Sequence, residues 1–148
     1  MDVPADKMNR WITARLEGID DLDEEVKFSI AKRAGELCAA DLMALCEKHL
    51  MRKRASASDL VARWNELRRQ RNRAGRWELN EGIVTTIFPE CGCPLVRSGM
   101  IELHPVQCHC SQSMIESIFS RVCKRPVRVL IRRLIGNGDG VCEFLIST

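Results

Sequence analysis

Apolar residues recur every three or four positions through the first half of the chain, which is the spacing of amphipathic helices. This pattern predicts a short helix over residues 7–17 and a long helix over residues 22–51. The stripe expected to bury the long helix consists of Val26, Ile30, Ala34, Leu37, Cys38, Leu42 and Leu45. A basic hinge at 52–58 leads to a third helix over about 59–72, for which Ser56 or Ser58 is the expected N-cap.

The pattern changes after Gly75, where β-branched residues and turn residues become dense. Residues 76–88 predict a strand, interrupted by a turn or bulge at Asn80-Glu81-Gly82. Residues 91–101 read as a loop with a short strand at 95–97, and a helix is expected over 111–124, where Ser113 and Glu116 resemble a capping box. Strands at 126–135 and 141–147 flank a Gly-Asn-Gly-Asp-Gly turn and predict a C-terminal hairpin.

These elements predict an α+β fold in which N-terminal helices are followed by an antiparallel sheet with one helix and a C-terminal β-hairpin. We expect a helical region at 1–74 and a cysteine-rich α+β unit at 75–148, packed together as one compact domain.

Composition and charge narrow the function classes. Aromatic residues make up only 5% of the 148 residues and tyrosine is absent, which disfavours a surface that stacks nucleic-acid bases. The net charge is a mild +3, with an acidic segment at 17–25 and a basic segment at 52–76. An acidic N-terminus and the absence of a long apolar run predict a cytoplasmic protein without a membrane segment. Phosphate-binding loops, paired catalytic carboxylates and serine-triad motifs are not evident.

Two Cys-x-Cys pairs carry the clearest chemistry: Cys91-Gly92-Cys93-Pro94 and Cys108-His109-Cys110-Ser111. In a reducing compartment, paired cysteines indicate metal binding or thiol chemistry rather than structural disulfides. Gly92 allows a turn that points both sulfurs at one ion, and a helix N-terminus after the second pair favours thiolates. Four sulfurs could complete a tetrahedral zinc site or bind an iron–sulfur cluster.

Other cysteines and histidines have plainer interpretations. His104 and His109 could replace a sulfur, although a lone histidine in a loop is more often solvated. Cys38 and Cys46 lie on the long helix and are expected in the core, and Cys142 on the apolar side of a strand reads as a small buried hydrophobe.

The cysteine pairs, the later Pro126-Val127-Arg128-Val129 and the segment from Gly138 to Phe144 together resemble a known group of proteins. That group is the L-2-amino-thiazoline-4-carboxylic acid hydrolase-like family, similar in its C-terminal half to 4-vinyl reductase-type small-molecule-binding domains. The resemblance covers roughly residues 75–148. It implies helices packed on an antiparallel sheet and a cysteine-lined pocket or metal site for a small molecule, with Cys142 as a candidate fifth member.

Three functions follow as hypotheses. The first is a protein that binds zinc or an iron–sulfur cluster and senses a small-molecule ligand, with metal ligands Cys91, Cys93, Cys108, Cys110 and Cys142. The second is a cysteine-dependent hydrolase of a small heterocyclic or amide substrate, with Cys110 or Cys108 as nucleophile and His109 or His104 as base. The third is a DNA-binding regulator that uses the basic segment 52–76, although that segment could simply complement the acidic one within the chain or across a homodimer.

Overall fold

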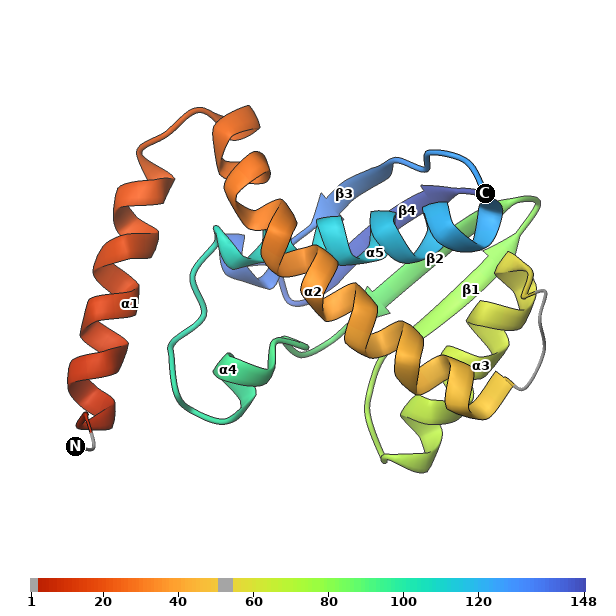
Figure 1. Ribbon diagram of the computed structural model, residues 1–148, viewed down its shortest axis with the longest axis horizontal. Coiled ribbons are helices and arrows are strands. Elements are labelled where there is room, and N and C mark those ends of the chain that lie inside the picture. Colours follow the sequence, from red (N-terminus) through yellow and green to blue (C-terminus); the bar gives the residue numbers. More distant parts are fainter. Residues whose placement is uncertain (1–2, 51–54) are drawn as a thin grey trace.

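The computed structural model describes residues 3–50 and 55–148, apart from the side chains at 46, 47, 49 and 50. The elements in chain order are α1 (Ala5–Asp20), α2 (Glu24–Leu50), α3 (Ala57–Gln70), β1 (Arg76–Asn80), β2 (Ile83–Phe88), α4 (Pro94–Arg97), α5 (Gln107–Cys123), β3 (Val129–Arg133), η1 (Ile135–Asn137) and β4 (Cys142–Ser147). Helices precede an antiparallel sheet, α5 interrupts the strands, and β3 pairs with β4 (Figure 1). The predicted α+β class and its arrangement are therefore confirmed.

The four strands form one antiparallel sheet in the order β1-β2-β4-β3. Strands β1 and β2 are joined by a two-residue turn in which both Glu81 (φ 50°) and Gly82 (φ 78°) are left-handed. Two successive left-handed residues define the hairpin turn whose twist matches that of the flanking strands. The turn predicted at this position is thus present, and it divides the predicted strand 76–88 into β1 and β2.

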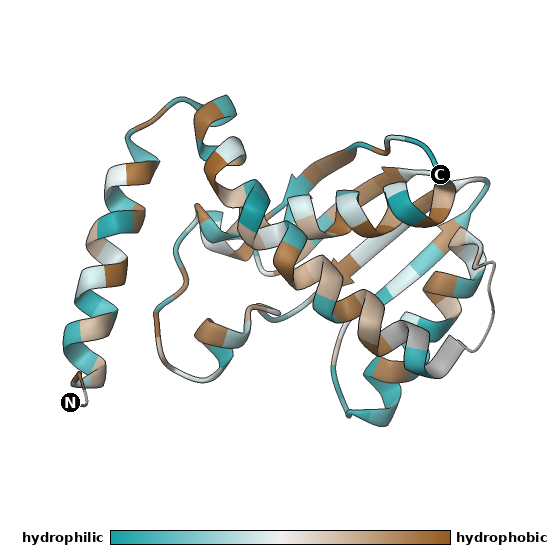
Figure 2. Ribbon diagram, viewed as in Figure 1, coloured by the Kyte–Doolittle hydropathy of each residue, from teal (hydrophilic) through white to brown (hydrophobic). Residues whose placement is uncertain are grey.

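One face of the sheet is covered by helices α3 and α5, and α2 lies across α5 as an outer layer (Figure 1). The side chains on the covered face are almost fully buried, including Val84, Thr86, Phe144 and Ile146. Trp77 of β1 stacks on Trp64 of α3 at 4.6 Å between ring centroids. The apolar residues of the sheet and of α5 are accordingly concentrated where the two layers meet (Figure 2).

Helix α2 contacts α5 through small residues, and the predicted stripe on α2 is wrong except near its C-terminal end, where Leu42 and Leu45 are partly buried and pack against the core. The buried positions of this helix are Ala31, Gly35, Ala39 and Met43. A Cβ at Gly35 would lie 2.5 Å from the carbonyl oxygen of Cys110, so the two helices approach more closely than a larger side chain would allow. Val26, Ile30, Leu37 and Cys38 consequently remain exposed, with Leu37 at 67%.

Three local predictions on capping and boundaries have different outcomes. Ser56 caps α3, because its side chain accepts the backbone N–H of Asp59 while the Asp59 carboxylate accepts the N–H of Ser56. The strand predicted at 95–97 is wrong, since Pro94 begins the short helix α4 instead. The helix predicted from 111 begins at Gln107.

The capping box predicted within that helix is also wrong. Ser113 is buried inside α5, where its hydroxyl donates to the carbonyl of Lys32 on α2 at 3.0 Å. The carboxylate of Glu116 accepts the backbone N–H of Val129 at 3.0 Å. Both side chains therefore join α5 to neighbouring elements rather than ending the helix.

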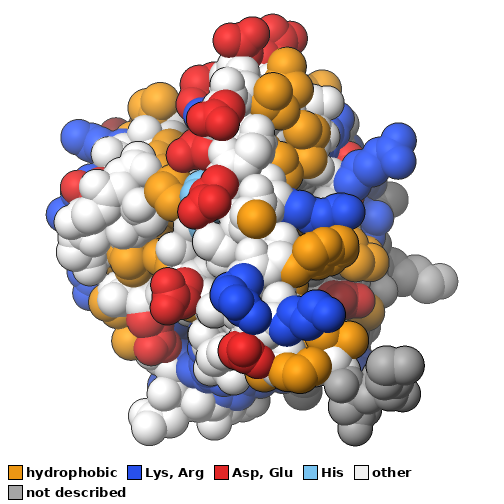
Figure 3. All heavy atoms as spheres, turned by 90° about the vertical axis from the view of Figure 1, so that its left-hand side faces the viewer, with side chains coloured by type: hydrophobic (Ala, Val, Ile, Leu, Met, Phe, Trp, Pro, Cys, Tyr) orange, Lys and Arg blue, Asp and Glu red, His pale blue; other side chains and the backbone are white. Residues whose placement is uncertain are grey.

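Helix α1 and the start of α2 form a hairpin at the edge of the molecule, and α1 has no buried residue. Acidic side chains gather at the upper part of this face, beside exposed apolar ones (Figure 3). Part of the predicted basic hinge, residues 52–54, lies outside the described residues. In the part of the chain that is described, no helix is both long enough and apolar enough to cross a bilayer.

Candidate thiol site

Six cysteines from four separate segments form a chain of neighbouring pairs, in which each thiol lies within electrostatic reach of at least two others. Cys38 comes from α2, Cys91 and Cys93 from the loop between β2 and α4, Cys108 and Cys110 from the first turn of α5, and Cys142 from the start of β4. The sheet positions part of the group, because Phe88 at the end of β2 pairs directly with Cys142. The chain that leaves β2 therefore carries Cys91 past the first residue of β4.

Cys108 and Cys142 form the centre of this group. The thiol of Cys108 donates a hydrogen bond to the sulfur of Cys142, which also accepts the backbone N–H of Ile135 at 3.3 Å. The bond from Cys108 is the main cause that lowers the pKa of Cys142 to about 7, and it raises the pKa of Cys108 together with burial. Near neutral pH the Cys142 thiol is therefore partly ionised, while Cys108 stays protonated.

Gly136 allows α5 to begin against the turn η1. A Cβ at this position would lie 3.0 Å from both the Cys108 sulfur and the Cα of Pro105. Only a residue without a side chain leaves room for that contact. The Gly-Asn-Gly-Asp-Gly segment therefore contributes to the position of Cys108 as well as to the hairpin.

The remaining thiols are linked to this pair through charge. Burial raises the pKa of Cys91, and the charges of Cys93 and Cys142 add to that effect. Burial also raises the pKa of Cys110 to about 11, with further contributions from Cys38 and Cys93. Each negative charge therefore disfavours the next thiolate, as expected where several acidic groups share a small region.

Sequence reasoning missed Cys38, which was predicted to pack in the core. The residue is exposed, although partial burial of the thiol, followed by the charge of Cys93, raises its pKa. Cys38 lies one helical turn beyond Gly35, so the close crossing of α2 and α5 brings it toward Cys110. The row of small residues Ala31, Gly35 and Ala39 is the sequence feature that could have indicated this orientation.

Among the cysteines whose side chains are described, Cys123 stays apart from the thiol cluster, by which we mean Cys38, Cys91, Cys93, Cys108, Cys110 and Cys142. Cys123 ends α5 and packs against the hydrophobic core. At 1.5 Å per residue it lies about 20 Å along the helix from Cys110. The side chain of Cys46, also predicted in the core, lies outside the described residues.

The two histidines engage other partners. His109 Nε2 lies 3.4 Å from a carboxylate oxygen of Glu24 on α2. His104 accepts the backbone N–H of Val106 through Nδ1, and the backbone N–H of His104 donates to Oε1 of Gln107. These two bonds fix the chain at the start of α5. A cysteine–histidine dyad needs the base within hydrogen-bond distance of the sulfur. The hydrolase hypothesis stays a prediction without a contact of that kind to support it.

The donor atoms of the thiol cluster suit a thiophilic metal, because soft thiolate ligands select zinc, copper(I) and iron–sulfur clusters. Among the described residues, no three potential ligands are arranged to hold a single ion. Zinc–sulfur bonds of about 2.3 Å require sulfurs close together, so a zinc site would need the loop with Cys91 and Cys93 to move toward α5. A Cβ at Gly92 would have no neighbour within 4 Å, which leaves space beside the loop.

Comparisons with known proteins add no assignment to this geometry. No protein-family model matches the chain, and no curated protein sequence matches it.

Proposed function

We propose that the protein binds a thiophilic metal centre, a zinc ion or an iron–sulfur cluster, through Cys91, Cys93, Cys108, Cys110 and Cys142. The observation that carries the proposal is the convergence of these thiols from three segments that are distant in sequence. Packing alone gives no reason for so many thiols to meet while each disfavours the ionisation of its neighbours. A bound cation would offset that repulsion and favour the thiolate form of every ligand.

The cysteines would contribute to the site in two ways, as fixed ligands and as ligands on a loop. Cys108 and Cys142 are held by the ends of α5 and β4, and the Ile135 N–H supports a negative charge on Cys142. Cys91 and Cys93 lie in a loop without regular structure. We infer that the loop supplies the adjustable half of the site and closes when the metal binds. A bound metal would supply structural stability and, for an iron–sulfur cluster, one-electron chemistry.

We also propose that the protein senses a small molecule through this site. The thiol cluster lies at the joint between α2, α5 and the sheet, and a ligand that reached it could shift these elements relative to one another.

The test is metal analysis of the full chain purified without oxygen, together with its ultraviolet–visible spectrum. We expect about one zinc or one iron–sulfur cluster per chain, retained in Cys123→Ser and strongly reduced in Cys93→Ser and Cys110→Ser. Cys123→Ser is the matched control because it removes a thiol of the same helix outside the thiol cluster. Wild-type protein that holds no metal and takes up neither zinc nor a reconstituted cluster would refute the proposal.

A further inference from the structure

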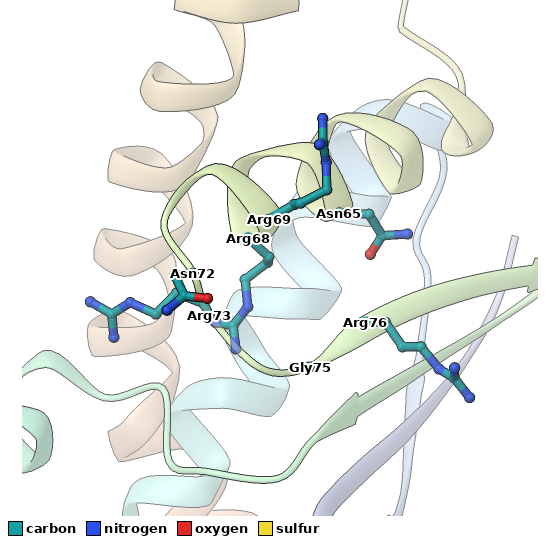
Figure 4. Close-up of a pocket in the computed structure, with 7 residues that line it drawn as sticks. All are labelled: Asn65, Arg68, Arg69, Asn72, Arg73, Gly75 and Arg76. Atoms are coloured by element: carbon teal, nitrogen blue, oxygen red, sulfur yellow. The ribbon is translucent and has the colours of Figure 1, made fainter.

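Four arginines line a hollow between the end of α3 and the start of β1, and their guanidinium groups point in different directions (Figure 4). The cavity has a volume of about 310 Å³. Its arginines are Arg68, Arg69, Arg73 and Arg76. No acidic residue lines it, so its charge is strongly positive for its size.

Arg68 is the best-fixed of these side chains. Its guanidinium carbon lies 5.5 Å from the ring centroid of Phe88 and 5.8 Å from that of Trp64. Contacts of this kind attract the cation through the faces of the rings. They leave the in-plane N–H groups, which are the hydrogen-bond donors of arginine, without acceptors.

Those donors are unsatisfied in the part of the chain that the structure describes. Nε and Nη2 of Arg68 are buried and have no hydrogen-bond partner. A buried donor without a partner costs about 1–3 kcal/mol, and more when it carries charge. A structural role in packing does not explain this arrangement, because methionine or leucine would fill the same space without that penalty.

The backbone at Gly75 leaves space for the guanidinium of Arg68. Gly75 has a φ of +99°, and a Cβ there would lie 2.9 Å from Nη2 of Arg68 and 3.0 Å from the carbonyl oxygen of Ile87. The left-handed conformation and the lack of a side chain let the chain turn directly beside the guanidinium. Gly75 therefore holds Arg68 at the wall of the cavity.

The charges around the cavity are only partly balanced. Arg69 pairs with Glu66 at 2.6 Å, and Arg76 pairs with Glu78 at 2.9 Å. Among the described residues, no carboxylate lies within ion-pair distance of Arg68 or Arg73, although the charge of Glu90 acts on Arg68 from farther away. Two guanidinium groups are thus left for a ligand, and planar guanidinium groups suit the oxygens of phosphate through paired hydrogen bonds.

We propose that this cavity binds a phosphate group, either as inorganic phosphate or as the phosphate monoester of a small molecule. Arg68 donates from its buried edge once a small local movement uncovers Nε and Nη2, and Arg73 donates from the rim once its side chain turns toward the ligand. The site is independent of the proposed metal centre, since it shares no residue with the thiol cluster. Its volume is at the lower end of small-molecule sites, which fits a phosphate with a short organic group.

The experiment is calorimetric titration of the reduced full chain with inorganic phosphate in a phosphate-free buffer. We expect one saturable site with a Kd of about 0.1–1 mM. Arg73→Gln should weaken binding roughly tenfold or more, because it removes charged donors. Arg10→Gln should leave the Kd unchanged, since Arg10 lies exposed on α1 in an i,i+4 pair with Asp6. A parallel titration with glycerol phosphate separates the two sources: tighter binding indicates a monoester, and weaker binding indicates inorganic phosphate.

Three results would overturn the proposal. The first is no saturable binding of either phosphate up to about 10 mM by folded wild-type protein. The second is an unchanged Kd in both Arg73→Gln and a folded Arg68→Met. The third is tight, salt-sensitive binding of a short DNA duplex without binding of small phosphates, which would instead indicate a nucleic-acid surface. Arg73→Gln keeps the test decisive if Arg68→Met fails to fold, because Arg73 is not part of the core.

Discussion

Replacing Gly35 with alanine tests the close crossing of α2 and α5 on which the thiol cluster depends. The added Cβ would lie 2.5 Å from the Cys110 carbonyl oxygen and 2.6 Å from the Cβ of Ser113. Ordinary contacts between carbon atoms are about 3.5–4.0 Å, so the helices must separate by roughly 1 Å. Such overpacking costs about 1–3 kcal/mol. Separation would also weaken the hydrogen bond from Ser113 to Lys32, at about 1 kcal/mol.

Alanine gains about 1 kcal/mol over glycine in helix propensity, which offsets part of that cost. We therefore expect Gly35→Ala to lower the free energy of unfolding by about 1–3 kcal/mol. For a chain of this size, that corresponds to a fall in Tm of between about 2 and 12 °C. The assay is thermal and urea unfolding of reduced, metal-free protein, followed by circular dichroism.

Gly18→Ala is the matched control, because Gly18 lies in α1 and a Cβ there has no neighbour within 4 Å. In this variant only the helix propensity changes, so the free energy of unfolding should stay the same or rise by up to about 1 kcal/mol. If Gly35→Ala were as stable as the wild type, or more stable, the close approach of α2 to α5 would be incorrect.

Four further predictions follow from local contacts. In reduced, metal-free protein, thiolate absorbance should show one thiol ionising near pH 7, and Cys108→Ala should raise that pKa because Cys142 loses its hydrogen bond. Since the folded pKa of Cys142 lies below the 9.0 of a free thiol, its contribution to stability is present above pH 9 and is lost as pH falls through 7. The thiols with raised pKa values oppose this effect near pH 9, so urea unfolding should show stability rising between about pH 7 and 8, and no rise there would contradict the prediction. Asn65→Ala should cost about 2–4 kcal/mol in urea unfolding, because the Asn65 side chain binds both the N–H and the carbonyl of Trp77; a loss below about 0.5 kcal/mol would argue against these bonds. Ser56→Ala should cost about 1 kcal/mol while Ser58→Ala changes little, and equal effects would show that Ser56 is not the cap.

The strands were largely predictable because their signals are local. Val84, Thr86 and Phe88 alternate with less buried residues along β2, as one covered sheet face requires. The turn at Glu81 and Gly82 follows from glycine's tolerance of positive φ. Residues 76–88 and 126–147 therefore carried enough information in short windows to indicate antiparallel strands.

The orientation of α2 was not predictable by the same reasoning. A stripe of large apolar residues usually marks the buried face, but here the neighbouring helix selects the face that permits the closest approach. Gly35 and Ala39 lose little side-chain entropy when buried, and the contact with α5 is made largely by backbone and small side chains. Ile30 and Leu37 remain outside because no described element packs over them.

The candidate site was predicted in part. The two Cys-x-Cys pairs and Cys142 were singled out from spacing and resemblance; in the structure they are linked pair by pair through the electrostatics of their thiols, and their role as metal ligands stays a prediction. Cys38 joins them only through the tertiary crossing of two helices, which no local pattern encodes. His109 illustrates the opposite case: its neighbours in sequence suggested a catalytic base, and its nearest charged partner is Glu24.

Strand order has a consequence for how the chain acquires its structure during synthesis. β4 follows every other described element along the sequence, yet it lies between β2 and β3. While residues 142–147 are still inside the ribosome, β2 and β3 have no shared partner, and α5 has only an incomplete sheet to pack against. A ribosome stalled before this strand emerges should therefore present a nascent chain that is readily digested by protease, with Cys91 and Cys108 open to alkylation.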